Sequence, residues 1–201
     1  MAGWLSRLEF DDDPWQTRPI RLCPVRLRRP PASSPIVSPE HLPMTRVLFV
    51  CLGNICRSPL AEGIARHHAS LAWDADQWVF DSAGTADYHS GEPPNPSSVR
   101  IARQRGIDIS GQRARQVVAA DLRRFDVLVA MDRSNLSGLQ RLDTAADGQL
   151  VLFRSFDEVA ASPDVPDPWG HGMDAFAEVY DILDRTMPRL LAYARGVARQ
   201  T

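Results

Sequence analysis

The sequence contains no lysine, so all 23 of its basic residues are arginine, which suggests a GC-rich coding sequence and a bacterial source. Against 25 acidic residues the formal net charge is −2. This balance gives no electrostatic reason to expect binding to nucleic acid or to an anionic membrane surface. No apolar run approaches the length that a membrane-spanning helix needs. We therefore predict neither nucleic acid nor membrane as a partner.

Cysteine is also scarce, with three residues in a chain of 201. Cys23 lies far along the chain from Cys51 and Cys56, so the spacing implies no disulfide framework. A reducing cytoplasm is the expected setting for such a protein. The five histidines show no metal-ligand spacing, and no metal site is predicted.

Two segments of different character share the chain. Residues 1–43 hold half of the 16 prolines and show no helix or strand periodicity, which predicts a Pro/Arg-rich, extended and solvated N-terminal extension. It lacks the apolar core of a secretory signal, and Asp11 to Asp13 argue against a transit peptide. Two interpretations compete: a disordered extension that docks a partner, or the product of a start codon assigned upstream of the true one. We favour a tail without essential function. Residues 44–201 suffice for one domain with its own core.

The stretch Arg46–Gly63, RVLFVCLGNICRSPLAEG, has the pattern of a strand, a tight loop and a helix. The apolar run Val47–Val50 is typical of a strand that is buried on both faces. Gly53 and Asn54 favour a turn after it. Ser58 followed by a proline is typical of a helix start, with the serine hydroxyl as the cap.

Between this strand and this helix stands the spacing C-x5-R, from Cys51 to Arg57. The backbone N–H groups of such a loop converge on one hollow, and the helix dipole adds positive potential there. The amides and Arg57 favour the thiolate form of Cys51, and the guanidinium can hold two phosphate oxygens at once. The hydroxyl of Ser58 can also donate to that thiolate. The bare spacing also fits a buried cysteine that merely ends a strand. In this context it predicts attack by the Cys51 sulfur on a bound oxyanion.

Beyond this stretch the pattern alternates between strands and helices. We expect strands at about 46–51, 79–84, 127–130 and 150–153, and helices at about 58–71, 97–105, 121–125, from residue 134, and 173–195. Such alternation predicts a parallel sheet with right-handed crossovers and helices on both faces. Cys51, Ser82 and Asp132 fall at carboxyl ends of strands, where open α/β sheets bind ligands. Asp132 and Asn135 are interpreted as caps of the helix that follows.

Attack by sulfur on a phosphoryl group needs an acid for the leaving oxygen and later a base for the attacking water. Asp167 is the best candidate, because Pro166 and Pro168 stiffen its loop. A dianion bound beside it would favour the protonated carboxyl group. An aspartate in a proline turn without a catalytic role fits the same residues, and Asp164 is the nearby alternative acid.

Several motifs resemble those of the low-molecular-weight protein tyrosine phosphatases. They are CLGNICRSPLAEG at 51–63, DSAGT at 81–85, ARQ at 114–116, MDRSN at 131–135 and PDPW at 166–169. The likeness spans Met44 to the C-terminus. It implies a three-layer α/β fold, flavodoxin-like, with a four-stranded parallel sheet and helices on both faces. It also implies hydrolysis of phosphotyrosine in proteins through a cysteinyl-phosphate intermediate, without metal or cofactor.

The resemblance assigns roles to individual residues. It makes Cys51 the nucleophile, Arg57 the phosphate ligand and Asp167 the general acid. The phosphate-binding loop would consist of Leu52, Gly53, Asn54, Ile55, Cys56, Arg57 and Ser58. Partners implied are phosphotyrosine-containing proteins, with a tyrosine kinase as a second one to consider.

Four further positions follow from the same resemblance. Tyr88 and Trp169 align with aromatic residues that wall the substrate cleft of the family. The Asn54 side chain is expected to tie the loop to Ser82. Gln112 stands where the family often has a histidine in this supporting network, so the loop is expected to be held a little differently.

Three rival functions stay open at this stage. Arsenate reduction would use the same cradle, but no cysteine follows Cys56, so it would need an external low-molecular-weight thiol. Protein arginine phosphatases of this kind have threonine where Ile55 stands, and the isoleucine favours tyrosine. A non-catalytic phosphotyrosine-binding module is disfavoured, because Cys51, Arg57 and Asp167 are all intact.

Overall fold

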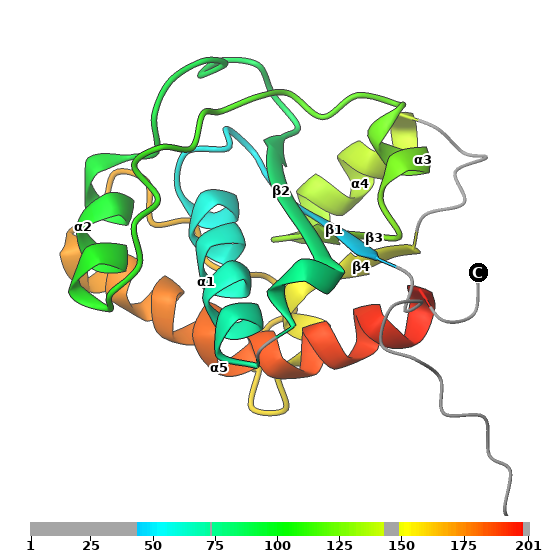
Figure 1. Ribbon diagram of the computed structural model, residues 1–201. Coiled ribbons are helices and arrows are strands. Elements are labelled where there is room, and N and C mark those ends of the chain that lie inside the picture. The colour runs from blue at the N-terminus through cyan, green and yellow to red at the C-terminus, as the bar shows by residue number, and fades with distance from the viewer. Residues whose placement is uncertain (1–43, 73, 143–148, 199–201) are drawn as a thin grey trace, which may run out of the picture. The chain divides into compact units, whose positions relative to one another are not determined.

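The computed structural model describes residues 44–72, 74–142 and 149–198, so the predicted extension over 1–43 lies outside the described residues. The elements are β1 (Thr45–Cys51), α1 (Arg57–Leu71), η2 (Ala75–Gln77), β2 (Trp78–Gly84), α2 (Pro96–Gln104), α3 (Asp121–Arg124), β3 (Val127–Ala130), α4 (Arg133–Leu142), β4 (Gln149–Leu152), η3 (Phe153–Phe156) and α5 (Met173–Ala198). Strands and helices alternate, as the sequence predicts (Figure 1). Within this described part, none of the helices has the length and apolar character needed to cross a membrane.

The four strands form one parallel sheet in the order β2-β1-β3-β4, which confirms the predicted fold class. β1 pairs with β2 on one side and with β3 on the other. In this register Cys51 lies opposite Gly84, and Val50 lies opposite Ala130. The carboxyl ends of β1, β2 and β3 therefore meet at one edge of the sheet, where the loop after β1 begins.

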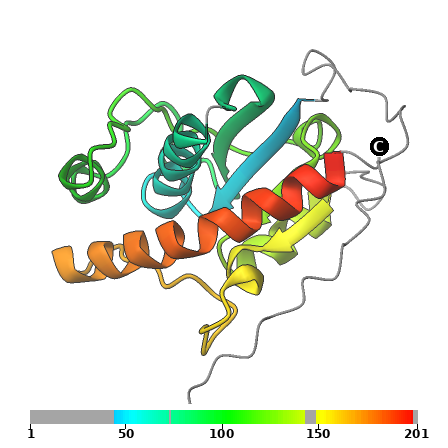
Figure 2. The same ribbon diagram turned by 60° about the horizontal axis from the view of Figure 1, so that its bottom comes forward.

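Successive side chains of β1 point to opposite faces of the sheet. Val47 and Phe49 belong to one buried apolar cluster, which includes side chains of α1, α2 and α5. Leu48 and Val50 belong to a second cluster with side chains of α3 and α4. Helices thus cover both faces (Figure 1), and Figure 2 looks onto α5 in front of the sheet. Burial on both faces explains the uninterrupted apolar run of β1.

Several element boundaries differ from the sequence-based expectation, and the start of α1 is a correction. This helix begins at Arg57 with Cys56 at its N-cap position, and no side chain caps it. Ser58 lies inside the first turn and is not the predicted cap, whereas its hydroxyl does face Cys51, which is the other contact expected of it. In the edge strand β4, the last residue is Leu152 and not the expected residue 153, because Phe153 begins the 3-10 helix η3.

Phe49 offers a test of this packing. It is fully buried in the central part of the sheet, and its ring centroid lies 6.4 Å from the rings of both Phe80 and Phe153. We expect Phe49→Ala to lower the free energy of unfolding by about 3–5 kcal/mol, through lost burial and the cavity left behind. Urea unfolding measures the change. The control Leu71→Ala alters a side chain that is 64% exposed, and should cost less than about 0.5 kcal/mol. Equal stability of the two variants would contradict the core described here.

Candidate active site

The loop between β1 and α1 curls around the sulfur of Cys51. Asn54 lies in this turn with φ of 54°, the single positive φ of a non-glycine residue in the described part of the chain. Asparagine tolerates this left-handed conformation better than most residues. The turn points the Asn54 N–H at the Cys51 sulfur, 3.3 Å away. Both cysteines of the loop are buried and free, at positions 51 and 56.

A hydroxyl group also contacts this sulfur. The Ser58 Oγ lies 3.0 Å from the Cys51 Sγ. The same oxygen accepts a hydrogen bond from the Asn54 Nδ2 at 3.0 Å. The hydroxyl hydrogen therefore remains available to the sulfur, with the carbonyl oxygen of Ala83 as a longer alternative acceptor at 3.4 Å. An N–H and a hydroxyl group are thus both directed at this sulfur.

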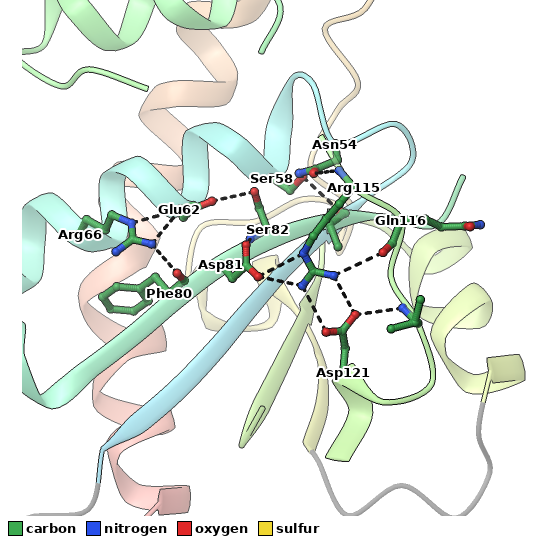
Figure 3. Close-up of polar contacts among 12 residues, drawn as sticks. Asn54, Ser58, Glu62, Arg66, Phe80, Asp81, Ser82, Arg115, Gln116 and Asp121 are labelled. Atoms are coloured by element: carbon green, nitrogen blue, oxygen red, sulfur yellow. Dashed lines mark hydrogen bonds and ion pairs between the residues drawn. The ribbon is translucent and has the colours of Figure 1, made fainter. Parts of the chain in front are cut away.

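The Asn54 amide is held differently from what the resemblance implies. Its Oδ1 accepts the backbone N–H of Arg115 at 2.9 Å. The hydroxyl of Ser82, which was expected to bind Asn54, donates instead to Glu62 at 2.8 Å. The expected link between Asn54 and Ser82 is thus replaced by a backbone donor, because the segment around Arg115 lies alongside the loop (Figure 3).

Gln112 does not lie at the Cys51 cavity either. It lines a separate hollow with Glu62, Arg66 and Ile109, where its Oε1 is buried and has no hydrogen-bond donor among the described residues. Gln112 therefore does not contact the loop, and it cannot have the supporting role that the resemblance implied. The backbone of Arg115 supplies the bond instead.

Arg57 brings a buried positive charge to the site, with a side chain that is 3% exposed. Its Nη1 donates to Asp132 at 2.7 Å and to the carbonyl oxygen of Val165 at 3.1 Å, and its Nη2 donates to Asp167 at 2.7 Å. Burial is the largest influence and acts to lower the pKa of Arg57. The negative charges of Cys51, Asp167 and Asp132 outweigh it and raise that pKa. The guanidinium therefore stays charged.

Asp132 has a role that the sequence analysis missed. Its Oδ1 accepts the N–H of Asn135 at 2.7 Å, which is the capping contact that was expected. Its Oδ2 forms the ion pair with Arg57. The signal for this second role was available, since Asp132 follows β3 at the same sheet edge as Cys51. The Asn135 side chain caps nothing, and its buried Oδ1 lacks a partner in the described part of the structure.

The two candidate acids differ clearly in their surroundings. Asp164 is gripped by Arg133, whose Nε and Nη2 donate to it at 3.1 and 2.8 Å and whose backbone N–H also donates. These hydrogen bonds hold the pKa of Asp164 below its ordinary value and favour the charged form of this carboxyl group. Asp167 lines the cavity that contains Cys51, and its side chain is 44% exposed. The geometry therefore favours Asp167 over Asp164 as the general acid.

The cavity above the sulfur has a volume of about 230 Å³. It is lined by Cys51, Leu52, Gly53, Ile55, Cys56, Arg57, Tyr88, His89, Asp167 and Trp169. Tyr88 and Trp169 are largely exposed, as residues at the mouth of a cleft are. His89 was not anticipated from the sequence; its Nδ1 lies 2.9 Å from Glu92. No cluster of side chains in the described ranges has the composition of a metal site.

The family of this chain follows from comparison with known proteins. The model of the low molecular weight phosphotyrosine protein phosphatases matches residues 46–200. The chain belongs to this family. It is 39% identical over 153 residues to the low molecular weight protein-tyrosine-phosphatase YfkJ of Bacillus subtilis, covering 74% of this chain and 95% of that protein. It is 38% identical over 154 residues to the corresponding phosphatase of Streptomyces coelicolor, covering 75% and 93%.

Solved structures of similar proteins agree with the fold. The crystal structure of YfkJ from Bacillus subtilis superposes with a TM-score of 0.70 at 38% identity, covering 75% of this chain and 94% of that one. A Drosophila arginine phosphatase superposes with a TM-score of 0.68 at 30% identity, covering 73% and 96%. Both the expected family and the expected fold are thereby confirmed.

The two loop cysteines should differ sharply in reactivity. Burial, followed by the negative charges of Cys51 and Asp167, raises the pKa of Cys56 to about 12. Below that pH Cys56 stays a thiol, with a thiolate fraction of about 10⁻⁵ at pH 7. We expect iodoacetate at pH 7 to carboxymethylate Cys51 and leave Cys56 intact, and inorganic phosphate to slow the reaction. Peptide mapping by mass spectrometry locates the label. Labelling of Cys56 ahead of Cys51 would contradict this assignment.

Proposed function

We propose that this protein is a phosphomonoesterase that hydrolyses phosphotyrosine in proteins. The observation that carries the proposal is the convergence on one cavity of the Cys51 sulfur, the buried Arg57 guanidinium and the Asp167 carboxyl group. Family membership supports it, since YfkJ and the Streptomyces coelicolor relative are both named protein-tyrosine-phosphatases.

The reaction begins with a phosphate ester in the hollow of the loop. The Cys51 sulfur attacks phosphorus, and the bond between phosphorus and the phenolic oxygen breaks. Arg57 and the loop amides hold the non-bridging oxygens, where negative charge remains. Asp167 gives its proton to the departing oxygen, so that the phenol leaves neutral.

The second half releases phosphate. A water molecule takes the place of the phenol, and Asp167, now a carboxylate, accepts a proton from it as the oxygen attacks the cysteinyl-phosphate. The bond between sulfur and phosphorus breaks, and Cys51 returns as a thiolate. In the structure Asp167 accepts a hydrogen bond from Arg57. A phosphate dianion competes for that guanidinium and, as a neighbouring negative charge, favours the protonated carboxyl group that the first step needs.

The cavity wall supports an aryl substrate. Tyr88 and Trp169 offer aromatic faces at the mouth, and Cys51, a residue that is 2% exposed, lies at the buried end. A phenyl phosphate is long enough to reach such a sulfur from the surface, whereas the shorter side chain of phosphoserine is not. Flat rings also stack favourably on the phenyl group.

The rival activities fit less well. The Drosophila arginine phosphatase is a similar structure, but Ile55 places an apolar side chain in this cavity. It offers no acceptor for the extra N–H groups of a phosphorylated guanidinium. For arsenate reduction, the loop cysteines are the only thiols in the described residues, and Cys56 is kept protonated by burial.

The same proposal includes the setting of the enzyme. A nucleophile that must stay a free thiolate fits a reducing cytoplasm, and a tyrosine kinase is the class of enzyme that would supply the substrate. The domain spans residues 44–201, and the Pro/Arg-rich extension over 1–43 carries no function that catalysis needs.

Hydrolysis of phosphotyrosine peptides by the full chain, with EDTA present, tests the proposal. We expect turnover with EDTA, slower or no turnover of matched phosphoserine and phosphoarginine peptides, and no turnover by Cys51→Ser, because serine at this position is not ionised. Malachite green measures the released phosphate. Retained turnover by Cys51→Ser, or faster cleavage of phosphoarginine, would refute it.

Asp167→Asn tests the general acid separately. We expect the rate constant kcat for a phosphotyrosine peptide to fall about 10²–10⁴-fold, because the amide cannot donate a proton to the leaving oxygen. The inhibition constant of inorganic phosphate should change little. Steady-state kinetics measure both quantities.

Asp164→Asn is the matched control for this variant. It should keep kcat within about threefold, since Asp164 is bound by Arg133 outside the cavity. If kcat falls further in Asp164→Asn than in Asp167→Asn, Asp164 and not Asp167 is the general acid.

A further inference from the structure

A cluster of three charged side chains lies behind the phosphate-binding loop. The Nε and Nη2 of Arg115 donate to Asp81 at 3.1 and 2.8 Å. Its Nη1 and Nη2 donate to the two oxygens of Asp121 at 2.9 and 3.2 Å. The three residues come from β2, from the segment before α3 and from α3 itself (Figure 3). One guanidinium thus joins two carboxylates that lie 40 residues apart in the sequence.

This cluster, Asp81–Arg115–Asp121, holds a stretch of backbone that contacts the loop directly. The N–H of Arg115 donates to the Asn54 Oδ1, and its carbonyl oxygen accepts the N–H of Gly84 at 2.8 Å. The amide of Asn54 in turn donates to Ser58, whose hydroxyl faces the sulfur of Cys51. A continuous series of hydrogen bonds therefore joins the cluster to the nucleophile.

The same stretch of backbone also supports the wall of the cleft. The N–H of Ala114 donates to the carbonyl oxygen of Glu92 at 2.9 Å, and its carbonyl oxygen accepts the N–H of Gly91 at 2.8 Å. Gly91 and Glu92 follow Tyr88 and His89, which line the cavity. Displacing this segment would therefore disturb both the loop and the cleft wall.

We propose that Arg115 is a positioning residue for catalysis: gripped by Asp81 and Asp121, it fixes the backbone N–H that orients Asn54, and through Asn54 the Ser58 hydroxyl against Cys51. This inference rests on the proposed function of Cys51 as nucleophile. Arg115 acts through the loop and does not line the cavity.

The residue types suit this task. Asn54 sits in a left-handed conformation, and its side-chain hydrogen bonds to Ser58 and Arg115 hold it there. A planar guanidinium can bind two carboxylates in fixed directions at once, which an ammonium group does less rigidly. Asp121 is nearly buried, with a side chain 6% exposed. Its charge is therefore screened less by water than that of a surface pair.

Arg115→Met tests the proposal, and Arg115→Lys accompanies it because two carboxylates without their partner can impair folding. We expect Arg115→Met to lower kcat for para-nitrophenyl phosphate about 10- to 100-fold, with a smaller change in KM, since a shift of about 1 Å in a catalytic group costs up to about 10²-fold. Arg115→Lys should lie between this variant and the parent.

The second readout does not depend on turnover. The rate of iodoacetate alkylation of Cys51 is measured against pH, and we expect the midpoint of Arg115→Met to move upward as the Ser58 donor becomes less well placed. The charged and titratable groups that line the cavity with Cys51 are Arg57, Asp167, Cys56, Tyr88 and His89, and both variants leave them unchanged. Arg115→Lys keeps the positive charge at position 115, so a midpoint that is shifted in both variants reports the loop and not a lost charge.

Arg113→Met is the matched control, since Arg113 lies two residues away and its Nη1 donates to the carbonyl oxygens of Ser110 and Gln112. It should behave like the parent. The proposal is overturned if Arg115→Met, folded by circular dichroism, matches Arg113→Met within twofold in both readouts. If Arg115→Met does not fold, the proposal is overturned when Arg115→Lys has the same kcat and the same alkylation midpoint as the parent. If the parent itself hydrolyses no phosphate ester, the proposed function fails, and the alkylation profiles still decide the role of Arg115.

Discussion

A buried guanidinium is the feature on which the site depends. Arg57 is almost completely shielded from water, and a charge in that position is costly unless anions and carbonyl oxygens surround it. Asp132, Asp167 and the Val165 carbonyl oxygen meet this need from segments more than 70 residues further along the chain. The charge therefore draws the ends of β1 and β3 and the proline loop of Asp167 together. It also places a positively charged group in the lining of the cavity.

The environment gives different chemistry to residues of the same type. Cys51 faces an N–H and a hydroxyl, whereas Cys56 is buried with a carboxylate and the Cys51 sulfur as its negative neighbours. One sulfur is thereby suited to attack, and the other remains a thiol. Asp164 and Asp167 also differ in their surroundings. Arg133 donates hydrogen bonds to Asp164, whereas Asp167 lines the cavity. Residue type alone could not have separated either pair.

The sequence predicted the fold and the central loop because both depend on local patterns. The apolar run of β1 and the Gly-Asn turn are readable within a few residues, and the alternation of strands and helices limits the topology to few forms. The partners of the loop were not readable, since they depend on which strands become neighbours. Asp132 meets Arg57 only because β3 lies beside β1. Ser58 was misassigned as a cap, because a serine before a proline has the same local pattern whether its hydroxyl faces the backbone or a sulfur.

The supporting network shows how a changed residue can leave a site intact. The resemblance assigned a supporting role to Gln112, yet this residue lines another hollow. The Asn54 amide nevertheless has a donor, and it is the backbone N–H of Arg115. A backbone N–H is retained in every substitution except one to proline. The site therefore depends on the position of this segment and not on the side chain at position 112. The pair of carboxylates that binds Arg115 supplies that position, and none of these three residues lines the cavity.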